Sequence, residues 1–214
     1  MKTRTSTIRF ASSELSRSRH VCAFFNNQED AYKVLLPFIV DGFTCGHRAV
    51  HLLNPGDEAQ HLSRLRCEGI DTESAQRSGQ LEVRTNADVY LREGRFDQHR
   101  MFAEFEELAS GDAGSKFPLS RIVCQMDWAG EGRSDVTDLL AFEARVNDLW
   151  DQHEDAVICV YDLAKFGGET VIDIMRTHPM VVVGETMQEN PFYVPPSQFL
   201  QELGRRHHRK SGQS

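Results

Sequence analysis

The sequence predicts an α/β domain with a mostly parallel central sheet of about six strands, flanked by helices on both faces. Short apolar segments rich in β-branched residues recur along the chain, and segments with apolar residues at helical spacing lie between them. Asn, Gly and Pro residues separate the two kinds of segment. Strands that alternate with helices in this way form βαβ units with right-handed crossovers, which produce a parallel sheet buried on both sides.

Six segments are predicted as strands, because each is a short apolar run bounded by turn-forming residues. In one of them, residues 81–84, apolar and charged side chains alternate, so we expect this strand near an edge of the sheet. The predicted strands cover residues 20–25, 48–53, 81–84, 121–126, 156–162 and 179–184.

Helices are predicted between these strands from apolar residues that recur every three or four positions. Asp97 and Ser134-Asp135 are expected to cap two of them, since short polar side chains satisfy free amides at helix N-termini. Residues 87–95 are expected to form one helical turn and a loop. The predicted helices cover residues 29–43, 57–67, 71–79, 97–108, 134–149, 168–175 and 197–203.

Length and charge limit the range of functions. The 214 residues suit one domain, and the net charge of -8 disfavours nucleic-acid binding, which needs clustered Lys and Arg. Residues 1–18, rich in Ser, Thr and Arg, and the basic residues 204–214 are expected to be disordered tails.

The cysteines indicate a cytoplasmic protein. The chain has five, without CxxC spacing, and three of them lie in apolar strand-like segments. This pattern fits neither a disulfide framework nor a zinc ribbon, so buried thiols in a reducing compartment are expected. No segment is long and apolar enough to predict a membrane span.

The loop after the first strand lacks the features of a phosphate-binding loop. It reads Phe25-Asn26-Asn27-Gln28-Glu29-Asp30, with two carboxylates and no glycine. A phosphate cradle needs glycines for close approach of the backbone and usually a lysine. Neither GxxxxGK[ST] nor a GxGxxG after a strand occurs in the chain. A conventional ATPase or dinucleotide enzyme is therefore disfavoured.

Two predicted strands end in a carboxylate beside an aromatic residue, Asp127 with Trp128 and Tyr161 with Asp162. Ligands of open α/β sheets bind outside the carboxyl ends of the strands, so these four residues are candidates for the wall of a ligand pocket. The carboxylates could also act as an acid–base pair or hold a hard cation. The structural alternative, which we favour for the carboxylates, is that each caps the loop or helix that follows.

Three further groups are weaker candidates. His178 and Asn190 flank the last strand in segments rich in polar residues, and we include them in the ligand site. His20 and Cys22 share one face of the first strand, and Cys159 lies on another strand, so a His/Cys metal or haem site is an alternative. A core histidine among buried thiols explains the same pattern, and we expect no metal and no cofactor.

Six short motifs follow one another along the chain: His20-Val21-Cys22-Ala23-Phe24-Phe25, Leu36-Pro37-Phe38 to Gly42-Phe43, Met126-Asp127-Trp128-Ala129, Cys159-Val160-Tyr161-Asp162-Leu163, Thr177-His178-Pro179 and Asn190-Pro191-Phe192-Tyr193-Val194-Pro195-Pro196. Together and in this order they resemble the MEDS family, the methanogen/methylotroph, DcmR-type sensory domain, over residues 19–203. The resemblance implies a RecA/KaiC-like three-layer domain that has lost its phosphate loop, with Asp127 near the position of a Walker B acid.

The resemblance implies a prokaryotic signalling module that binds a small organic ligand, without catalytic turnover, and signals through a separate protein partner. We expect no direct contact with nucleic acid or membrane, and the sequence also allows a homo-oligomer. Two alternatives stay open: a degenerate RecA/KaiC-like nucleotide-binding protein, with residual hydrolysis, and a protein-interaction regulator of a kinase or transcription factor.

Overall fold

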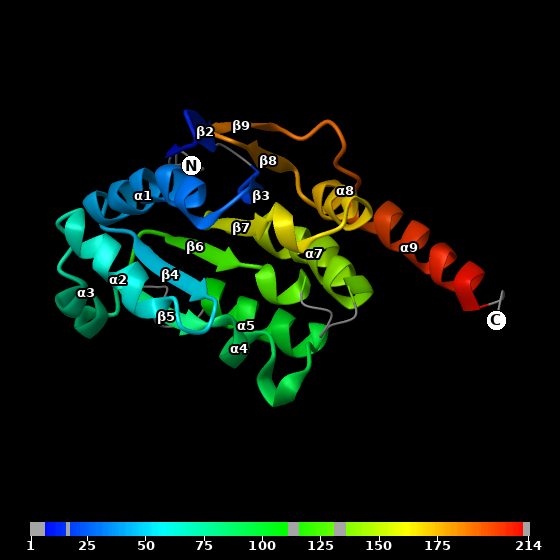
Figure 1. The fold of residues 1–214 in the computed structure, drawn as a ribbon, viewed down its shortest axis with the longest axis horizontal. Coiled ribbons are helices and arrows are strands. Elements are labelled where there is room, and N and C mark those ends of the chain that lie inside the picture. The colour runs from blue at the N-terminus through cyan, green and yellow to red at the C-terminus, as the bar shows by residue number, and fades with distance from the viewer. Residues whose placement is uncertain (1–6, 16–17, 111–115, 131–135, 212–214) are drawn as a thin grey trace.

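The computed structural model describes residues 7–15, 18–110, 116–130 and 136–211, and these fold around one seven-stranded sheet (Figure 1). The strand order is β5-β4-β6-β7-β3-β8-β9, and all neighbours are parallel except β8 and β9. The strands of this sheet are β3 (His20–Phe25), β4 (Arg48–Leu53), β5 (Leu81–Thr85), β6 (Ser120–Gln125), β7 (Ala156–Asp162), β8 (Met180–Val183) and β9 (Thr186–Glu189).

All six predicted strands are present, and the predicted α/β class is confirmed. β5 pairs only with β4, so the strand with alternating charges forms an edge of the sheet as predicted. β3 and β7, by contrast, are interior strands and almost wholly buried, which explains their continuous apolar sequence.

Helices connect the strands broadly as predicted. Asp97 Oδ1 accepts hydrogen bonds from the amides of His99 and Arg100, which confirms it as a cap, whereas the predicted cap Ser134-Asp135 lies outside the described residues. The helices are α1 (Gln28–Thr44), α2 (Glu58–Cys67), α3 (Thr72–Ser78), α4 (Asn86–Val89), α5 (Gln98–Ser110), α7 (Val136–Trp150), α8 (Gly168–Thr177) and α9 (Pro196–Ser211), with 3-10 turns η1 (Arg92–Gly94), η2 (Asp127–Gly130) and η3 (Leu163–Lys165).

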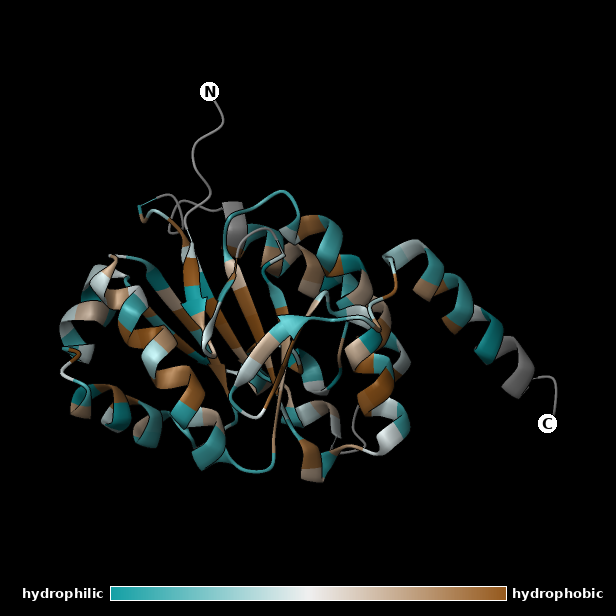
Figure 2. Cartoon of the chain, turned by 90° about the horizontal axis from the view of Figure 1, so that it is seen from above, coloured by the Kyte–Doolittle hydropathy of each residue, from teal (hydrophilic) through white to brown (hydrophobic). Residues whose placement is uncertain are grey.

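The sheet separates two hydrophobic cores. Alternate residues of β3 face opposite sides: Cys22 and Phe24 pack with residues of α5, α7, α8 and α9, whereas Val21, Ala23 and Phe25 pack with α1, α2 and α3. Figure 2 shows the hydrophobic strands in the centre and hydrophilic stretches on the outer surfaces of the helices. This arrangement is the three-layer architecture that the resemblance implied.

The N-terminal segment differs from the prediction. Residues 8–15, expected to be disordered, form a hairpin of β1 (Ile8–Phe10) and β2 (Ser13–Leu15), whose apolar side chains Ile8, Phe10 and Leu15 are at most 2% exposed. The amide of Met187 donates to the carbonyl oxygen of Ala11, so the hairpin also joins β9. Burial of these three side chains outweighs the entropy of ordering the segment.

The C-terminal part also contains more regular structure than predicted. A turn at Gly184, with φ of +63°, returns the chain as β9, where only Met187 is buried. Helix α9 continues to Ser211, past the predicted end at residue 203, and Arg206 forms a 2.6 Å ion pair with Asp173 of α8. The basic segment is therefore helical to residue 211, because Phe199 and Leu203 dock the helix on the domain. No helix within the described ranges is long and apolar enough to cross a bilayer.

Candidate ligand-binding site

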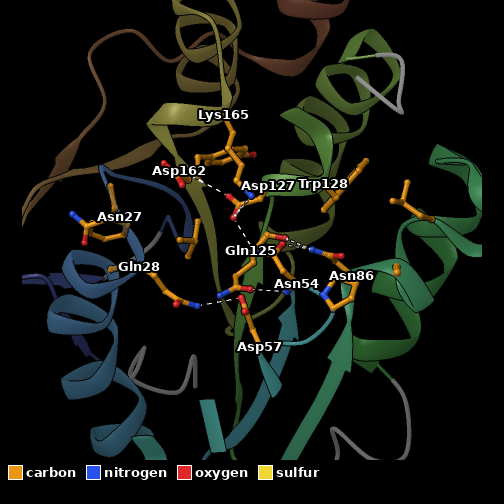
Figure 3. A pocket seen from close by; sticks show the side chains of 17 residues that line it. Asn27, Gln28, Asn54, Asp57, Asn86, Gln125, Asp127, Trp128, Asp162 and Lys165 are labelled. Atoms are coloured by element: carbon orange, nitrogen blue, oxygen red, sulfur yellow. Dashed lines mark hydrogen bonds and ion pairs between the residues drawn. The ribbon is translucent and has the colours of Figure 1, made fainter. Parts of the chain in front are cut away.

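A pocket of about 440 Å³ lies at the carboxyl ends of four neighbouring strands, β4, β6, β7 and β3 (Figure 3). Helix α1 leaves β3 on one face of the sheet, and α7 follows β6 on the other, which opens a crevice between them. The lining residues are Phe25, Asn27, Gln28, Ala31, Asn54, Pro55, Asp57, Asn86, Ala87, Leu91, Gln125, Asp127, Trp128, Val160, Tyr161, Asp162 and Lys165.

A directed hydrogen-bond network crosses the floor of this pocket. Asn86 Nδ2 donates to the backbone carbonyl of Gln125 (3.3 Å) and to Asn54 Oδ1 (2.7 Å). Asn54 Nδ2 in turn donates to Asp127 Oδ2 (2.8 Å), and the Asn54 amide donates to Gln125 Oε1 (2.6 Å). Because a carbonyl can only accept, the first bond fixes the direction of the others. The last donor of the network, Asn54 Nδ2, therefore needs a partner that can accept a hydrogen bond.

Asp127 supplies that acceptor with both of its oxygens. Oδ1 accepts the backbone amide of Asp162 at 3.2 Å, while Oδ2 accepts Asn54 and lies 3.5 Å from the Lys165 ammonium. The carboxylate thus connects β4, β6, β7 and η3. Both oxygens are engaged, which makes Asp127 an organiser of the pocket wall.

Asp162 has a different role, although it ends the neighbouring strand in the same way. Its Oδ1 accepts the amide of Ala164 at 2.9 Å and so caps η3. Asp162 therefore has the capping role that we favoured for it. The hydrogen bonds of Asp127 come instead from Asn54 and the Asp162 amide, so this carboxylate joins other segments and does not cap the residues that follow it.

The N-terminus of α1 shows why a phosphate would not bind there. Asn27 caps the helix by accepting the Asp30 amide at 2.9 Å, and Glu29 and Asp30 occupy the first turn. The helix dipole is therefore already complemented by acidic side chains. The residues that line the pocket contribute three carboxylates and a single ammonium group, which disfavours a polyanionic ligand.

The aromatic candidates line the pocket from the apolar core. Trp128 is 3% exposed and packs on Tyr90 and Phe96, with ring centroids 4.9 and 5.3 Å away. Tyr161 is fully buried, and its hydroxyl donates to Glu143 Oε1 at 3.3 Å. Both residues line the pocket, at the strand ends where they were predicted. The Tyr161 hydroxyl, however, is hydrogen-bonded to Glu143.

His178 and Asn190 are not among the residues that line this pocket. Asn190 Nδ2 donates to the carbonyl oxygens of Met175 and His178 at 2.5 and 2.8 Å, which holds the chain after β9 against the end of α8. His178 lies between α8 and β8 and is fully buried. The structure gives Asn190 a bracing role and places His178 in a second cluster.

That second cluster contains His20, Glu143, Cys159 and His178, whose side-chain ligand atoms all lie within 4.8 Å of one another. Burial raises the pKa of Glu143, but the adjacent His178 and His20 side chains outweigh it and bring its pKa to about 2. Burial lowers the pKa of His178. Of the predicted metal candidates, His20 and Cys159 are brought together, whereas the Cys22 thiol faces the Met180 carbonyl at 3.7 Å.

Several residues of the pocket were not predicted from the sequence. Asn54 belongs to a turn after β4, Asn86 begins α4, Gln125 ends β6 and Lys165 ends η3. A polar residue after each buried strand is the signal that could have identified Asn54 and Gln125. Lys165 carries no such signal. The backbone of Lys165 packs closely against Gly130, and this approach is possible because a glycine has no Cβ; a Cβ at this position would collide with the Lys165 carbonyl oxygen.

The model of the MEDS family, described as the methanogen/methylotroph, DcmR sensory domain, matches residues 19–179. Among solved structures, that of the flagellar accessory protein FlaH from Methanocaldococcus jannaschii is similar, with a TM-score of 0.50 and 11% identity. The match covers 80% of this chain and 76% of FlaH, and it shows a shared RecA-like fold alone. A comparison with curated proteins found no match. Since the family model spans well over half of the residues, the chain belongs to the MEDS family of sensory domains.

Proposed function

We propose that this chain binds a small, uncharged organic molecule in the pocket at the carboxyl edge of the sheet, and that binding is its function, without catalytic turnover. The observation that carries the proposal is the amide-rich lining of a 440 Å³ pocket, a size that small-molecule sites commonly have. Membership of a sensory-domain family supports the same reading.

The unpaired polar atoms of the pocket suggest what the ligand offers. Among the described residues, the Gln125 side-chain nitrogen has no hydrogen-bond acceptor, and the side-chain oxygens of Gln28 and Asn86 have no donor. This protein donor can pair with a carbonyl or hydroxyl oxygen of a ligand, and the two protein acceptors can pair with a hydroxyl or amide N–H group of the ligand. Phe25, Leu91 and the other apolar lining residues suit a short hydrocarbon portion.

The engaged state of Asp127 supports binding without turnover. Both oxygens of Asp127 accept hydrogen bonds from groups of the pocket wall, so the side chain has a structural role that involves no proton transfer. The signal would pass to a separate protein partner in the cytoplasm, where the free cysteines of the chain would stay reduced.

Native mass spectrometry of gently purified full-length protein, followed by thermal unfolding with one-carbon and hydrocarbon-derived alcohols, amides and ketones, tests the proposal. A ligand that binds the folded state raises the unfolding temperature. We expect at least one neutral compound to do so. If no bound molecule is detected and none of the compounds stabilises the protein, the proposal is wrong.

A pair of variants locates the binding site. Ala87 lines the pocket and is half-buried, whereas Ala59 is exposed on α2 and does not line it. Ala87→Trp should abolish the stabilisation by the ligand, and Ala59→Trp should preserve it. Equal stabilisation of both variants would place the ligand elsewhere.

Degenerate nucleotide binding, the second candidate, is favoured by the RecA-like fold and the position of Asp127 at the end of β6. ATP with Mg²⁺ serves as its probe in the same thermal assay. Stabilisation by ATP that is lost in Asp127→Asn would favour it over the organic ligand.

A further inference from the structure

The buried cluster of His20, Glu143, Cys159 and His178 joins four separate parts of the fold. His20 begins β3, Cys159 lies within β7, Glu143 projects from α7, and His178 stands between α8 and β8. Each of the four residues is at most 2% exposed. A glutamate and two histidines are costly to bury unless they are paired or hold an ion, so their meeting needs a physical explanation.

Hydrogen bonds orient both imidazoles with Nε2 toward the centre of the cluster. Asn147 Nδ2 donates to the carbonyl oxygens of Glu143, Ala144 and Thr177, so its Oδ1 must accept from His20 Nδ1 at 3.0 Å. His178 Nδ1 lies 2.8 Å from the carbonyl oxygen of Ile174, which can only accept. Each neutral imidazole therefore presents the lone pair of Nε2 to the cluster.

These lone pairs face the Glu143 carboxylate, which can only accept, and the Cys159 sulfur. Glu143 Oε2 lies 3.2 Å from His20 Nε2 and 3.4 Å from His178 Nε2, and the Cys159 sulfur lies 3.6 Å from His20 Nε2. His178 Nε2 is fully buried and has no hydrogen-bond partner within the described part of the chain. A positive centre between these atoms would satisfy all of them at once.

We propose that His20, Glu143, Cys159 and His178 bind one Zn²⁺ ion. Zinc bonds of about 2.0–2.3 Å in tetrahedral geometry separate neighbouring ligand atoms by about 3.3–3.7 Å. The three distances above are close to that range, and the pair of Cys159 sulfur and Glu143 Oε2, at 4.0 Å, needs only a small contraction. Two nitrogens, one sulfur and one oxygen form a donor set that zinc accepts.

Charge and surroundings favour the same ion. Zn²⁺ with one thiolate and one carboxylate has no net charge, so the occupied site suits a buried position. Outer hydrogen bonds hold the ligands in place: Asn147 on His20, the Ile174 carbonyl on His178, and the Tyr161 hydroxyl on the second oxygen of Glu143. Four protein ligands with no open position make the site structural.

The metal content and stability of full-length protein, purified without chelator, test the proposal. We expect about one zinc per chain by elemental mass spectrometry. A strong chelator should lower the unfolding temperature, and added Zn²⁺, but not Mg²⁺, should restore it, because Mg²⁺ prefers oxygen ligands. Protein that contains no zinc, takes up none after refolding with Zn²⁺ and is unaffected by chelator would overturn the proposal.

Two neighbouring cysteines provide a matched pair of variants. Cys22 and Cys159 are buried and face each other in register on β3 and β7, but the Cys22 thiol donates to the Met180 carbonyl. Cys159→Ser should weaken zinc binding by more than about 100-fold, the upper cost of losing an outer-shell partner. Cys22→Ser, which keeps a donor, should retain the metal. Equal zinc content in both folded variants would place the ion elsewhere and overturn the assignment.

Cobalt gives a readout that does not depend on a variant's folding. Co²⁺ in the wild-type site should show an intense thiolate-to-metal charge-transfer band, because Cys159 coordinates it. Where Cys159→Ser fails to fold, this spectrum decides the question. Bound Co²⁺ without the band would exclude a sulfur ligand and overturn the four-residue site.

Discussion

Replacing Asp127 with asparagine should destabilise the domain, although the two side chains have almost the same shape. The backbone amide of Asp162 donates to one oxygen of Asp127, and Asn54 Nδ2 donates to the other. An asparagine has one oxygen and one NH₂ group, so in either orientation a donor faces a donor. Asn54 cannot turn to relieve the conflict, because Asn86 already donates to its oxygen.

The structure sets the size of the effect. One hydrogen bond to a charged acceptor is lost, which costs about 1.5–3 kcal/mol where the groups are largely buried. The Asp127 side chain is 15% exposed, so most of that cost should apply. The 3.5 Å ion pair with half-exposed Lys165 adds at most about 1 kcal/mol after screening by solvent. We expect Asp127→Asn to lower the free energy of unfolding by about 2–3 kcal/mol.

Urea unfolding of the wild type, Asp127→Asn and Asp162→Asn measures this difference. Asp162 accepts a single capping bond from Ala164, which an asparagine can also accept, so Asp162→Asn should cost less than about 0.5 kcal/mol. Equal losses in the two variants, or a loss below about 0.5 kcal/mol in Asp127→Asn, would refute the argument that the network requires a carboxylate.

Three further predictions concern stability. Burial, helped by the nearby charge of Arg64, lowers the pKa of His61 from 6.5 to about 4. The contribution of neutral His61 to the free energy of unfolding should be complete above pH 6.5 and should be lost as the pH falls toward 4, at a cost of about 3 kcal/mol. Urea unfolding at several pH values in this range should show a free energy of unfolding that falls with decreasing pH, and that falls less steeply in His61→Gln. Gly130→Ala should cost about 1–3 kcal/mol through its clash with the Lys165 carbonyl, measured in the same way, and a neutral result would contradict the close approach. Leu15→Ala, in the hairpin, should cost about 2–4 kcal/mol; a loss below about 0.5 kcal/mol would mean that the hairpin adds little to the core.

The sequence predicted the interior strands well because their environment leaves little choice. β3 and β7 coincide with their predicted bounds, since a strand covered on both faces must be apolar throughout. The β1–β2 hairpin escaped prediction for the opposite reason. Ala11 and Ser12 adopt positive φ at its turn, where Gly or Asn would have been the expected signal, and only three of the residues in its strands are apolar and buried.

The candidate site was predicted by position more accurately than by role. Asp127 and Asp162 lie at the ends of the adjacent strands β6 and β7, but the partners of Asp127 come from segments distant in sequence, Asn54 through a hydrogen bond and Lys165 through an ion pair. The His20 cluster shows the same limit, because Glu143 lies on a helix and His178 before a strand 35 residues later in the chain, a distance that no local pattern connects. Local sequence indicates where strands end, whereas tertiary contacts decide which polar groups meet there.

The pocket includes the N-terminus of α1, which follows the first strand of the large sheet and is the place that a phosphate loop takes in proteins that have one. Asn27 caps α1 with its own side chain, so the helix N-terminus has no need of an anion. Asp127, in turn, accepts hydrogen bonds from Asn54 and the Asp162 amide and forms a 3.5 Å ion pair with Lys165. Among the described residues, the polar atoms left for a ligand include the side-chain amide groups of Gln28, Asn86 and Gln125. The specificity of the pocket should therefore depend on hydrogen-bond geometry and shape, and its affinity should change little with salt.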